Sequence, residues 1–380
     1  MGTLSRVDAR SIWLQVHLWL GLTLGVVGAL VGLTGSVLVF DNEVDALLNP
    51  QRYALTGSQV ALPYADYLQR AAQAVEGRAR PTNLRLPEGE GLPVVVLARA
   101  RAEGGGFHRV YLDPPTGRVL EVSAGGGFVG WAHNFHESLT LREYFGREIV
   151  GAVGIAMLIS SLSGLYLWWP PGGLGRRAFG FRPGFAPTRN LHYTCGFYGS
   201  LVLALLSFTG IFLAYPEPGR AIVGAFGPVS ASPRGIQAPE SPGRPIPPDN
   251  AVAIARALYP EAKVASLGLP AGPRGAYRVS LRALGDSSAR FGPVVFLDPR
   301  SGAVLNRADR ATRTRGDAFL VWQRVLHEGE AFGVAGRVVI CVTGALPALL
   351  VVTGAMIWLR QRRRPRAERV GAGAAVGSDA

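Results

Sequence analysis

The chain has 380 residues, of which 48% are hydrophobic, and its mean hydropathy is positive. This composition is unusual for a soluble protein and typical of a membrane protein with sizeable parts outside the bilayer. The formal net charge of +13 comes mostly from arginines beside apolar runs, so we expect no nucleic-acid partner and we expect contact with membrane lipid.

Four stretches without a formal charge are long enough to cross a bilayer as helices. They are residues 11–40, 149–171, 190–216 and 338–359. The first is too long for a signal-peptide core and ends in charged residues, so we expect it to remain as a helix. Arginines precede the first run, lie between the second and third, and follow the fourth. This distribution predicts cytoplasmic termini and two exported segments.

The sequence therefore predicts a mainly α membrane protein, with a four-helix transmembrane bundle and two exported α+β domains. The segments in chain order are 1–40 (N-terminal segment and first membrane helix), 41–127 (first exported domain), 128–171 (interfacial segment and second membrane helix), 172–189 (cytoplasmic loop), 190–216 (third membrane helix), 217–318 (exported linker and second exported domain), 319–360 (interfacial segment and fourth membrane helix) and 361–380 (cytoplasmic tail).

Each exported segment has a helical stretch, 64–75 or 250–258, before β-rich stretches at 93–99, 109–112, 118–122, 276–281 and 294–297. The motif Asp-Pro-x-[Thr/Ser]-Gly occurs once in each, and its residues are typical of a tight turn that closes a hairpin. Between 216 and 248 the chain is rich in Pro, Gly and Ser without clear periodicity, so we expect an irregular linker or lid there.

The two halves of the chain repeat each other. One set of residues recurs at identical spacing: His17, Gly21, Thr34 and Gly35, against His192, Gly196, Thr209 and Gly210. A second set recurs with offsets that differ by a single residue: His136-Glu137, Arg147, Gly164 and Trp168, against His327-Glu328, Arg337, Gly354 and Trp358. Because both halves begin and end in the cytoplasm, we expect a parallel repeat of helix, exported domain and helix.

The repeat pairs four histidines at two depths of the membrane. His17 and His192 lie near the cytoplasmic ends of the first and third membrane helices, and His136 and His327 lie just outside the second and fourth. Two neutral imidazoles from neighbouring helices suit the axial positions of a haem iron. Copper or zinc is the alternative, but either usually takes three or four ligands, and Cys195 is the only thiol near the inner pair.

Glycines follow His17 at positions 21, 25, 28, 32 and 35, and their spacing predicts that they share its helical face. A strip without side chains would leave room for a porphyrin, although the same spacing also marks plain helix–helix contact. His133 lies three residues before His136 and could share its helical face. Because only His136 has a counterpart in the repeat, we predict His136 as the ligand and give His133 a contact with a propionate, substrate or water. His108 is expected to be a surface residue.

Arg147 and Arg337 also match in the repeat, at the exported mouths of the second and fourth membrane helices. Two roles remain open for them. Each arginine could anchor a helix end, or its fork of donors could pair with haem propionates.

With these elements in order, the sequence resembles the PepSY-associated transmembrane family of bacterial inner-membrane proteins, which includes ferric-siderophore reductases. The resemblance rests on the repeated histidine patterns and on the two Asp-Pro-x-[Thr/Ser]-Gly hairpins, which are typical of PepSY domains, and it covers nearly the whole chain. The family often has His-Thr-Gly where this chain has His136-Glu137-Ser138 and His327-Glu328-Gly329. A carboxylate beside each outer ligand is therefore a departure whose effect on haem potential is open.

The resemblance implies four membrane helices and two b haems, with His17 and His192 holding the haem on the cytoplasmic side and His136 and His327 holding the haem on the periplasmic side. It also implies transfer of electrons to Fe(III) in a periplasmic ferric siderophore or other chelate, which would release iron for uptake. The sequence has no motif for a nucleotide donor, so a cytoplasmic reductase or a quinol would supply the electrons. Two alternatives are a haem-free PepSY sensor or inhibitory protein, and a haem subunit that donates electrons to a periplasmic enzyme.

Overall fold

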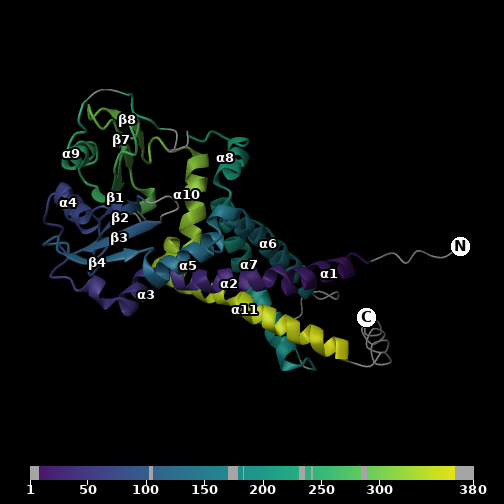
Figure 1. The fold of residues 1–380 in the computed structure, drawn as a ribbon. Helices are drawn as coiled ribbons and strands as arrows, with labels where there is room; N and C mark the ends of the chain where they lie inside the picture. Colours follow the sequence, from purple (N-terminus) through teal and green to yellow (C-terminus); the bar gives the residue numbers. More distant parts are fainter. Residues whose placement is uncertain are drawn as a thin grey trace.

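The computed structural model describes residues 8–101, 106–169, 179–182, 184–230, 236–240, 243–283 and 289–363. Long helices pack together as a bundle, and an antiparallel sheet lies at one end of this bundle (Figure 1). Parts of the predicted cytoplasmic loop 172–189 and of the predicted linker, and most of the predicted tail 361–380, fall outside the described residues.

Three helices are long and apolar enough to cross a membrane: α6 (Gly146–Trp168), α7 (Pro187–Ala214) and α11 (Gly333–Arg363). The first predicted span is instead two helices, α1 (Ala9–Leu22) and α2 (Leu24–Leu38), which are bent by 55° relative to each other. Thr23 lies at the break, and its hydroxyl donates to the carbonyl of Trp19 at 2.6 Å. The described part of the chain therefore provides three straight spans, and a fourth if the bent pair counts as one.

Helix packing, rather than open space, explains most of the glycine strip. A Cβ atom at Gly32 would lie 2.3 Å from the carbonyl oxygen of Gly344 on α11, and one at Gly28 would lie 2.7 Å from Sδ of Met157 on α6. Gly25 faces Val351 in the same way. Small residues at these positions allow the helix backbones to approach closely. The interpretation that the strip leaves room for a porphyrin is thus wrong for these three glycines, and the bend at Thr23 removes the single face on which it depended.

The two segments that the sequence predicted to be exported form one eight-stranded sheet, in the order β4-β3-β2-β1-β5-β6-β7-β8. Its strands are β1 (Ala79–Arg85), β2 (Val94–Ala100), β3 (Phe107–Leu112), β4 (Val119–Ala124), β5 (Lys263–Gly268), β6 (Tyr277–Arg282), β7 (Val294–Leu297) and β8 (Val304–Ala308). All neighbouring strands pair in antiparallel fashion. The two predicted α+β units are therefore halves of a single sheet.

The joint between the halves is the pairing of β1 with β5, two strands that the sequence analysis did not predict. Leu84 lies opposite Leu267 across this joint, and both are fully buried in a hydrophobic core that includes residues of both halves. Pro, Asn and Arg within β1 hide its alternation, because these residues are uncommon in strands. Since an isolated four-stranded half would expose this strand as an edge, joining the halves also protects two edges.

Helices α4 (Tyr64–Ala74) and α9 (Pro248–Leu258), both close to their predicted positions, cover one face of the sheet (Figure 1). The carboxylate of Asp249 on α9 accepts hydrogen bonds from the backbone N–H groups of Tyr64 at 2.7 Å and Ala65 at 3.0 Å. These donors have no partner within α4 because they lie in its first turn. One half of the chain therefore caps a helix of the other.

The two predicted hairpin turns are confirmed. Asp113 lies between β3 and β4 and accepts hydrogen bonds from the backbone and side chain of Thr56 at 2.8 and 2.6 Å. Asp298 lies between β7 and β8 and accepts from the backbone N–H groups of Arg300 and Ser301 at 2.7 and 3.1 Å. Both Asp-Pro motifs thus have a structural role in turn formation.

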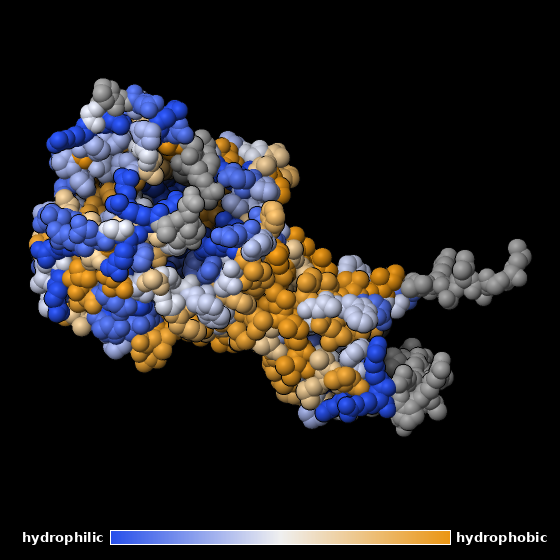
Figure 2. Space-filling model, in the orientation of Figure 1, coloured by the Kyte–Doolittle hydropathy of each residue, from blue (hydrophilic) through white to orange (hydrophobic). Residues whose placement is uncertain are grey.

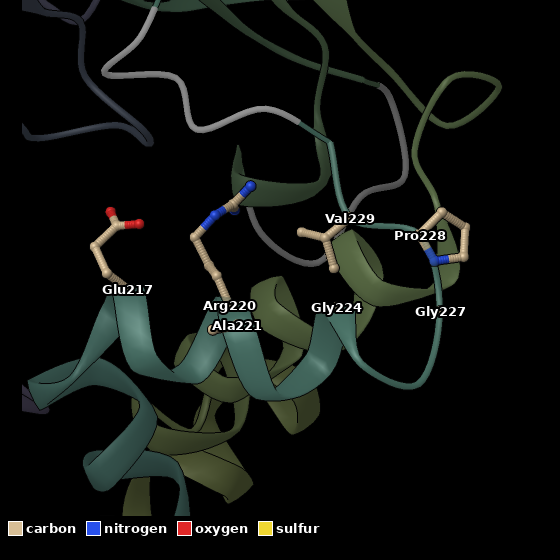
Figure 3. Close-up of a pocket in the computed structure, with 7 residues that line it drawn as sticks. All are labelled: Glu217, Arg220, Ala221, Gly224, Gly227, Pro228 and Val229. Carbon is tan, nitrogen blue, oxygen red and sulfur yellow. The ribbon is translucent and has the colours of Figure 1, made fainter.

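The expectation of an irregular linker after the third span is wrong at its start. Residues Pro216–Gly224 form helix α8, which begins with a proline in the first turn, a position that suits proline because its missing N–H would have no helical partner there. Glu217 and Arg220 project from α8 beside a shallow pocket of about 440 Å³, with Pro228 and Val229 on the returning chain (Figure 3). The guanidinium of Arg220 donates to the carbonyl of Ser230. None of the histidines lines this pocket.

Candidate functional site

The fold brings the four repeat-matched histidines together as two pairs. His17 on α1 and His192 on α7 have ring centroids 6.4 Å apart at an interplanar angle of 84°. His136 at the end of α5 (Gly127–Ser138) and His327 at the end of α10 (Arg315–His327) have centroids 6.1 Å apart at 54°. We call these the inner pair and the outer pair.

Each imidazole is anchored through Nδ1 to a neighbouring membrane helix. In the inner pair, Nδ1 of His17 lies 3.1 Å from the carbonyl oxygen of Ser160 and 3.2 Å from Oγ of Ser163, both on α6. Nδ1 of His192 lies 2.9 Å from Oγ1 of Thr353 on α11. Each half of the chain therefore holds its own inner histidine with its own last membrane helix.

The outer pair repeats this arrangement against the other two membrane helices. Nδ1 of His136 lies 2.8 Å from the carbonyl oxygen of Val31 on α2. Nδ1 of His327 lies 2.9 Å from Oγ1 of Thr209 on α7. Helix α7, which anchors His327, also carries the inner histidine His192. Helix α2, which anchors His136, directly follows α1, which carries the inner histidine His17.

These contacts define the tautomer of each ring. A carbonyl oxygen only accepts, so Nδ1 of His17 and of His136 must carry the proton. Thr209 donates its hydroxyl proton to backbone carbonyls of its own helix at 2.9 and 3.1 Å, and Thr353 does the same at 2.7 and 3.2 Å. Both hydroxyls therefore offer lone pairs to the imidazole. In all four rings the proton is on Nδ1, and the lone pair of Nε2 is available to a metal.

A glycine lies against Cε1 of every ring. A Cβ atom at Gly35 would lie 2.7 Å from Cε1 of His136, and one at Gly210 would lie 3.2 Å from Cε1 of His327. For the inner pair, Gly164 lies against His17 and Gly354 against His192, with corresponding distances of 2.9 and 3.3 Å. These glycines let each imidazole rest on the backbone of the neighbouring helix.

A residue with a side-chain hydroxyl precedes the supporting glycine at all four positions: Thr34-Gly35, Ser163-Gly164, Thr209-Gly210 and Thr353-Gly354. The hydroxyls of Ser163, Thr209 and Thr353 contact the imidazole, whereas that of Thr34 donates to carbonyls of its own helix. All four glycines are matched in the sequence repeat, but Ser163 and Thr353 had no predicted role. A hydroxyl residue before both Gly164 and Gly354 in the repeat was the signal that could have found them.

The geometry of both pairs fits a metal ion held between two rings. Two metal–nitrogen bonds of about 2.0 Å place the centroids of opposed imidazoles about 6 Å apart, close to the observed 6.4 and 6.1 Å. All four residues are half-buried. Desolvation lowers the pKa of His136, and desolvation together with His136 lowers the pKa of His327 to about 4. The outer imidazoles are therefore neutral near pH 7, as metal ligands must be.

The length of helix α7 gives the separation of the two pairs along the helix axis. His192 is near its start, and Gly210, which lies against His327, is near its end. Eighteen residues at 1.5 Å each give about 27 Å along the axis, which is close to the thickness of a hydrocarbon core. The two pairs are thus at opposite ends of the apolar layer.

His133 is not part of the outer pair. Its side chain is 47% exposed, and Nδ1 lies 3.7 Å from a carboxylate oxygen of Glu137. His136, three residues later on the same helix, contacts His327 instead. His108 is a half-buried residue of β3, and Cys195 is a free thiol on α7.

Arg147 and Arg337 each cap the C-terminal end of a membrane helix from the other half of the chain. Arg147 donates to the carbonyl of Leu213 on α7 at 2.6 Å. Arg337 donates to the carbonyl of Val39 at 2.9 and 2.7 Å and pairs with Glu43 at 2.9 Å. These carbonyls lack partners within their own helices. The structure thus places both arginines in the first of the two roles considered for them, and contact with propionates stays a prediction.

Within the described part of the chain, no group of three or more His, Cys, Asp or Glu side chains is arranged to hold a metal ion. The donor sets that the structure provides are the two histidine pairs. A family model described as the PepSY-associated TM region matches residues 14–361. No curated protein matches the chain.

Proposed function

The chain belongs to the PepSY-associated TM region family and is a membrane protein, and from this premise we propose that it is a membrane oxidoreductase with two b haems. In this proposal His17 and His192 hold one haem, and His136 and His327 hold the other. The reaction is the one-electron reduction of Fe(III) to Fe(II) in a ferric siderophore or other chelate outside the bacterial inner membrane. A reductase or a quinol on the cytoplasmic side is the donor and is oxidised by one electron for each iron reduced.

The observation that carries this proposal is the pairing of imidazoles at two depths, each with Nδ1 anchored and Nε2 free of hydrogen bonds among the described residues. A haem iron with two axial imidazoles supplies one-electron transfer without an open position for oxygen. Covalent attachment requires a Cys-x-x-Cys-His motif, and the two cysteines of this chain are in different helices. The residues present therefore fit a non-covalent, b-type group.

The residues of the chain contribute positioning and electrostatics. The Nδ1–H bonds to carbonyl and hydroxyl oxygens fix the orientation of each ring and raise the basicity of Nε2. Glu328, beside His327, accepts from Arg290 at 2.5 Å and from Arg324 at 3.1 Å. These cations balance the carboxylate that distinguishes this chain from the usual family motif. Gly21 and Gly196, one turn after the inner histidines, have no closer neighbour than Leu350 at 3.7 Å, so this part of the glycine pattern does leave room.

The direct test is an optical spectrum of protein purified in detergent. We expect the difference spectrum between the dithionite-reduced and oxidised forms to show the sharp α band of six-coordinate b haem. We also expect a pyridine haemochrome assay to give about two haems per protein, a ratio that requires both histidine pairs. Absence of the band in protein supplied with haem during expression would overturn the proposal.

Removal of a single hydroxyl tests the role of the anchor. Thr209→Val deletes the acceptor that Nδ1 of His327 uses, and loss of such an outer-shell partner typically costs about 10- to 100-fold in ligand affinity. We therefore expect faster loss of haem from the outer site on transfer to apomyoglobin. Thr34→Val is the matched control, because His136 bonds the carbonyl of Val31 rather than the hydroxyl of Thr34. Equal effects of the two variants would contradict the assigned hydrogen bond.

A further inference from the structure

One face of the sheet is not covered by α4 and α9, and it carries a group of arginines. Pairing across the strands puts Arg109 of β3, Leu97, Asn83, Gly268 and Arg278 of β6 in one continuous row. The neighbouring row holds Val95, Arg85 of β1, Ser266 and Ser280. Side chains in these two rows point to the same face because they alternate with the buried core residues. We call this surface the arginine face.

The residues between the arginines are small. Ser266 and Gly268 of β5 separate Arg85 from Arg278, and Gly268 lies directly against Cβ of Arg278 and the amide of Asn83. Arg85 and Arg278 are two strand spacings of about 4.8 Å apart and are shifted by two residues along the strands. Their backbones are therefore about 12 Å apart. Because only small side chains lie between them, the long side chains of both arginines can reach the same small molecule.

The guanidinium groups of Arg85 and Arg278 form no ion pair or side-chain hydrogen bond within the part of the chain that the structure describes. Nearby carboxylates have other partners: Glu88 pairs with Arg282 at 2.9 Å, and Glu43 with Arg337 at 2.9 Å. Among the described residues, Asp41 has no arginine partner at ion-pair distance, and burial raises its pKa. The arginine face therefore has an excess of positive charge.

The face is enclosed by protein yet reached by solvent. Arg85 and Arg278 are both exposed, but burial among protein atoms lowers the pKa of each, and the neighbouring Arg109 and Arg290 lower that of Arg85 further. Hydrophilic side chains gather in the hollow between the sheet and the helices (Figure 2). A bound anion would stabilise positive charges that are held close together on such a partly enclosed surface.

The arginine face adjoins the helices of the outer pair on both sides. The guanidinium of Arg109 lies against Gly126, directly before α5, which carries His136. Arg290, whose charge acts on Arg85, pairs at 2.5 Å with Glu328, the residue after His327. A ligand on this face would thus be a neighbour of both outer histidines.

We propose that the arginine face, through Arg85, Arg109 and Arg278, binds an anionic ferric chelate whose ligating groups are carboxylates. Guanidinium forks match carboxylates in bidentate geometry, so several of them favour a polycarboxylate complex over a neutral or cationic hydroxamate complex. The assignment of iron rests on the proposed function, whereas the assignment of an anion rests on the arginine face alone.

The first test is binding of gallium citrate, which has the charge and shape of a ferric complex but is not reduced, measured by calorimetry on the full chain in detergent. We expect the double variant Arg85→Gln/Arg278→Gln to bind at least tenfold more weakly. Arg256→Gln, which removes one positive charge from α9 on the covered side, should bind as the parent does. Replacement of both arginines by lysine should restore part of the affinity. Equal affinity of the parent and the double glutamine variant would overturn the proposal.

The second test is reoxidation of dithionite-reduced protein by ferric citrate and by a cationic ferric trihydroxamate. We expect the double variant to be reoxidised at least tenfold more slowly by ferric citrate and at an unchanged rate by the hydroxamate. Loss of the outer haem spectrum in this variant would show that the arginines hold propionates, which would overturn the proposal. A parent chain without haem that still binds gallium citrate would overturn the proposed function and leave the anion site standing.

Discussion

Changing His327 to alanine is expected to abolish the outer site and leave the inner site intact. His327 and His136 have ring centroids 6.1 Å apart, and about 27 Å of helix separates them from the inner pair. Loss of one axial ligand from a bis-imidazole iron removes the low-spin b spectrum of that site. We therefore expect about half of the α-band absorbance to remain, and the same result from His192→Ala at the inner pair, measured per mole of purified protein.

The matched controls are the histidines that the structure leaves outside the pairs. His133→Ala and His108→Ala should keep the full α band, because the first side chain is exposed beside Glu137 and the second lies on β3. His136→Ala should behave like His327→Ala. If His133→Ala loses half of the band while His136→Ala keeps all of it, the assignment of the outer ligand is wrong.

The second large effect is expected from a single added methyl group. A Cβ atom at Gly35 would lie 2.7 Å from Cε1 of His136, and one at Gly164 would lie 2.9 Å from Cε1 of His17. Neither distance can be accommodated without movement of the ring, and a displaced ligand loses both its Nδ1 bond and its alignment. We expect Gly35→Ala and Gly164→Ala to lower haem affinity by about 10- to 100-fold, each at its own site.

The size of the effect should follow the contact distance. Gly210→Ala and Gly354→Ala would put a Cβ atom 3.2 and 3.3 Å from Cε1 of His327 and His192, so we expect milder losses from them, again measured as rates of haem transfer to apomyoglobin. Gly154→Ala is the control, because its Cβ atom would be equally close, at 3.3 Å, but to Ile211 rather than to an imidazole. Haem loss from Gly154→Ala as rapid as from Gly35→Ala would show that general helix packing, and not ring support, is responsible.

Much of the candidate site could be predicted from the sequence because the repeat duplicates it. His136 was separated from His133 by the presence of a counterpart at His327, and the structure places His136 and His327 as neighbours. The glycine strip was a weaker guide. The same glycines serve helix packing at Gly28 and Gly32 and ring support at Gly35, and residue type alone does not distinguish these two uses.

The joining of the two halves of the sheet could not be predicted from local patterns. The hairpins were visible because Asp, Pro and Gly favour turns, and the helices because their apolar residues recur at helical spacing. β1 contains Pro81 and Asn83 and pairs with β5 far along the chain, so its stability comes from tertiary partners rather than from strand propensity. The arginine face exists only because this pairing aligns Arg85 and Arg278 on adjoining halves.

By itself the sequence determined the apolar stretches, the internal repeat and the four matched histidines, because hydrophobic length and repeated spacing are properties of the chain alone. The tertiary structure decided which atoms face each other: Nδ1 of His327 with Thr209, Cε1 of His136 with Gly35, and Arg147 with the carbonyl end of α7. Each of these contacts joins helices far apart in sequence. Their geometry depends on how closely the helix backbones approach, and that distance is fixed only when all the helices pack together.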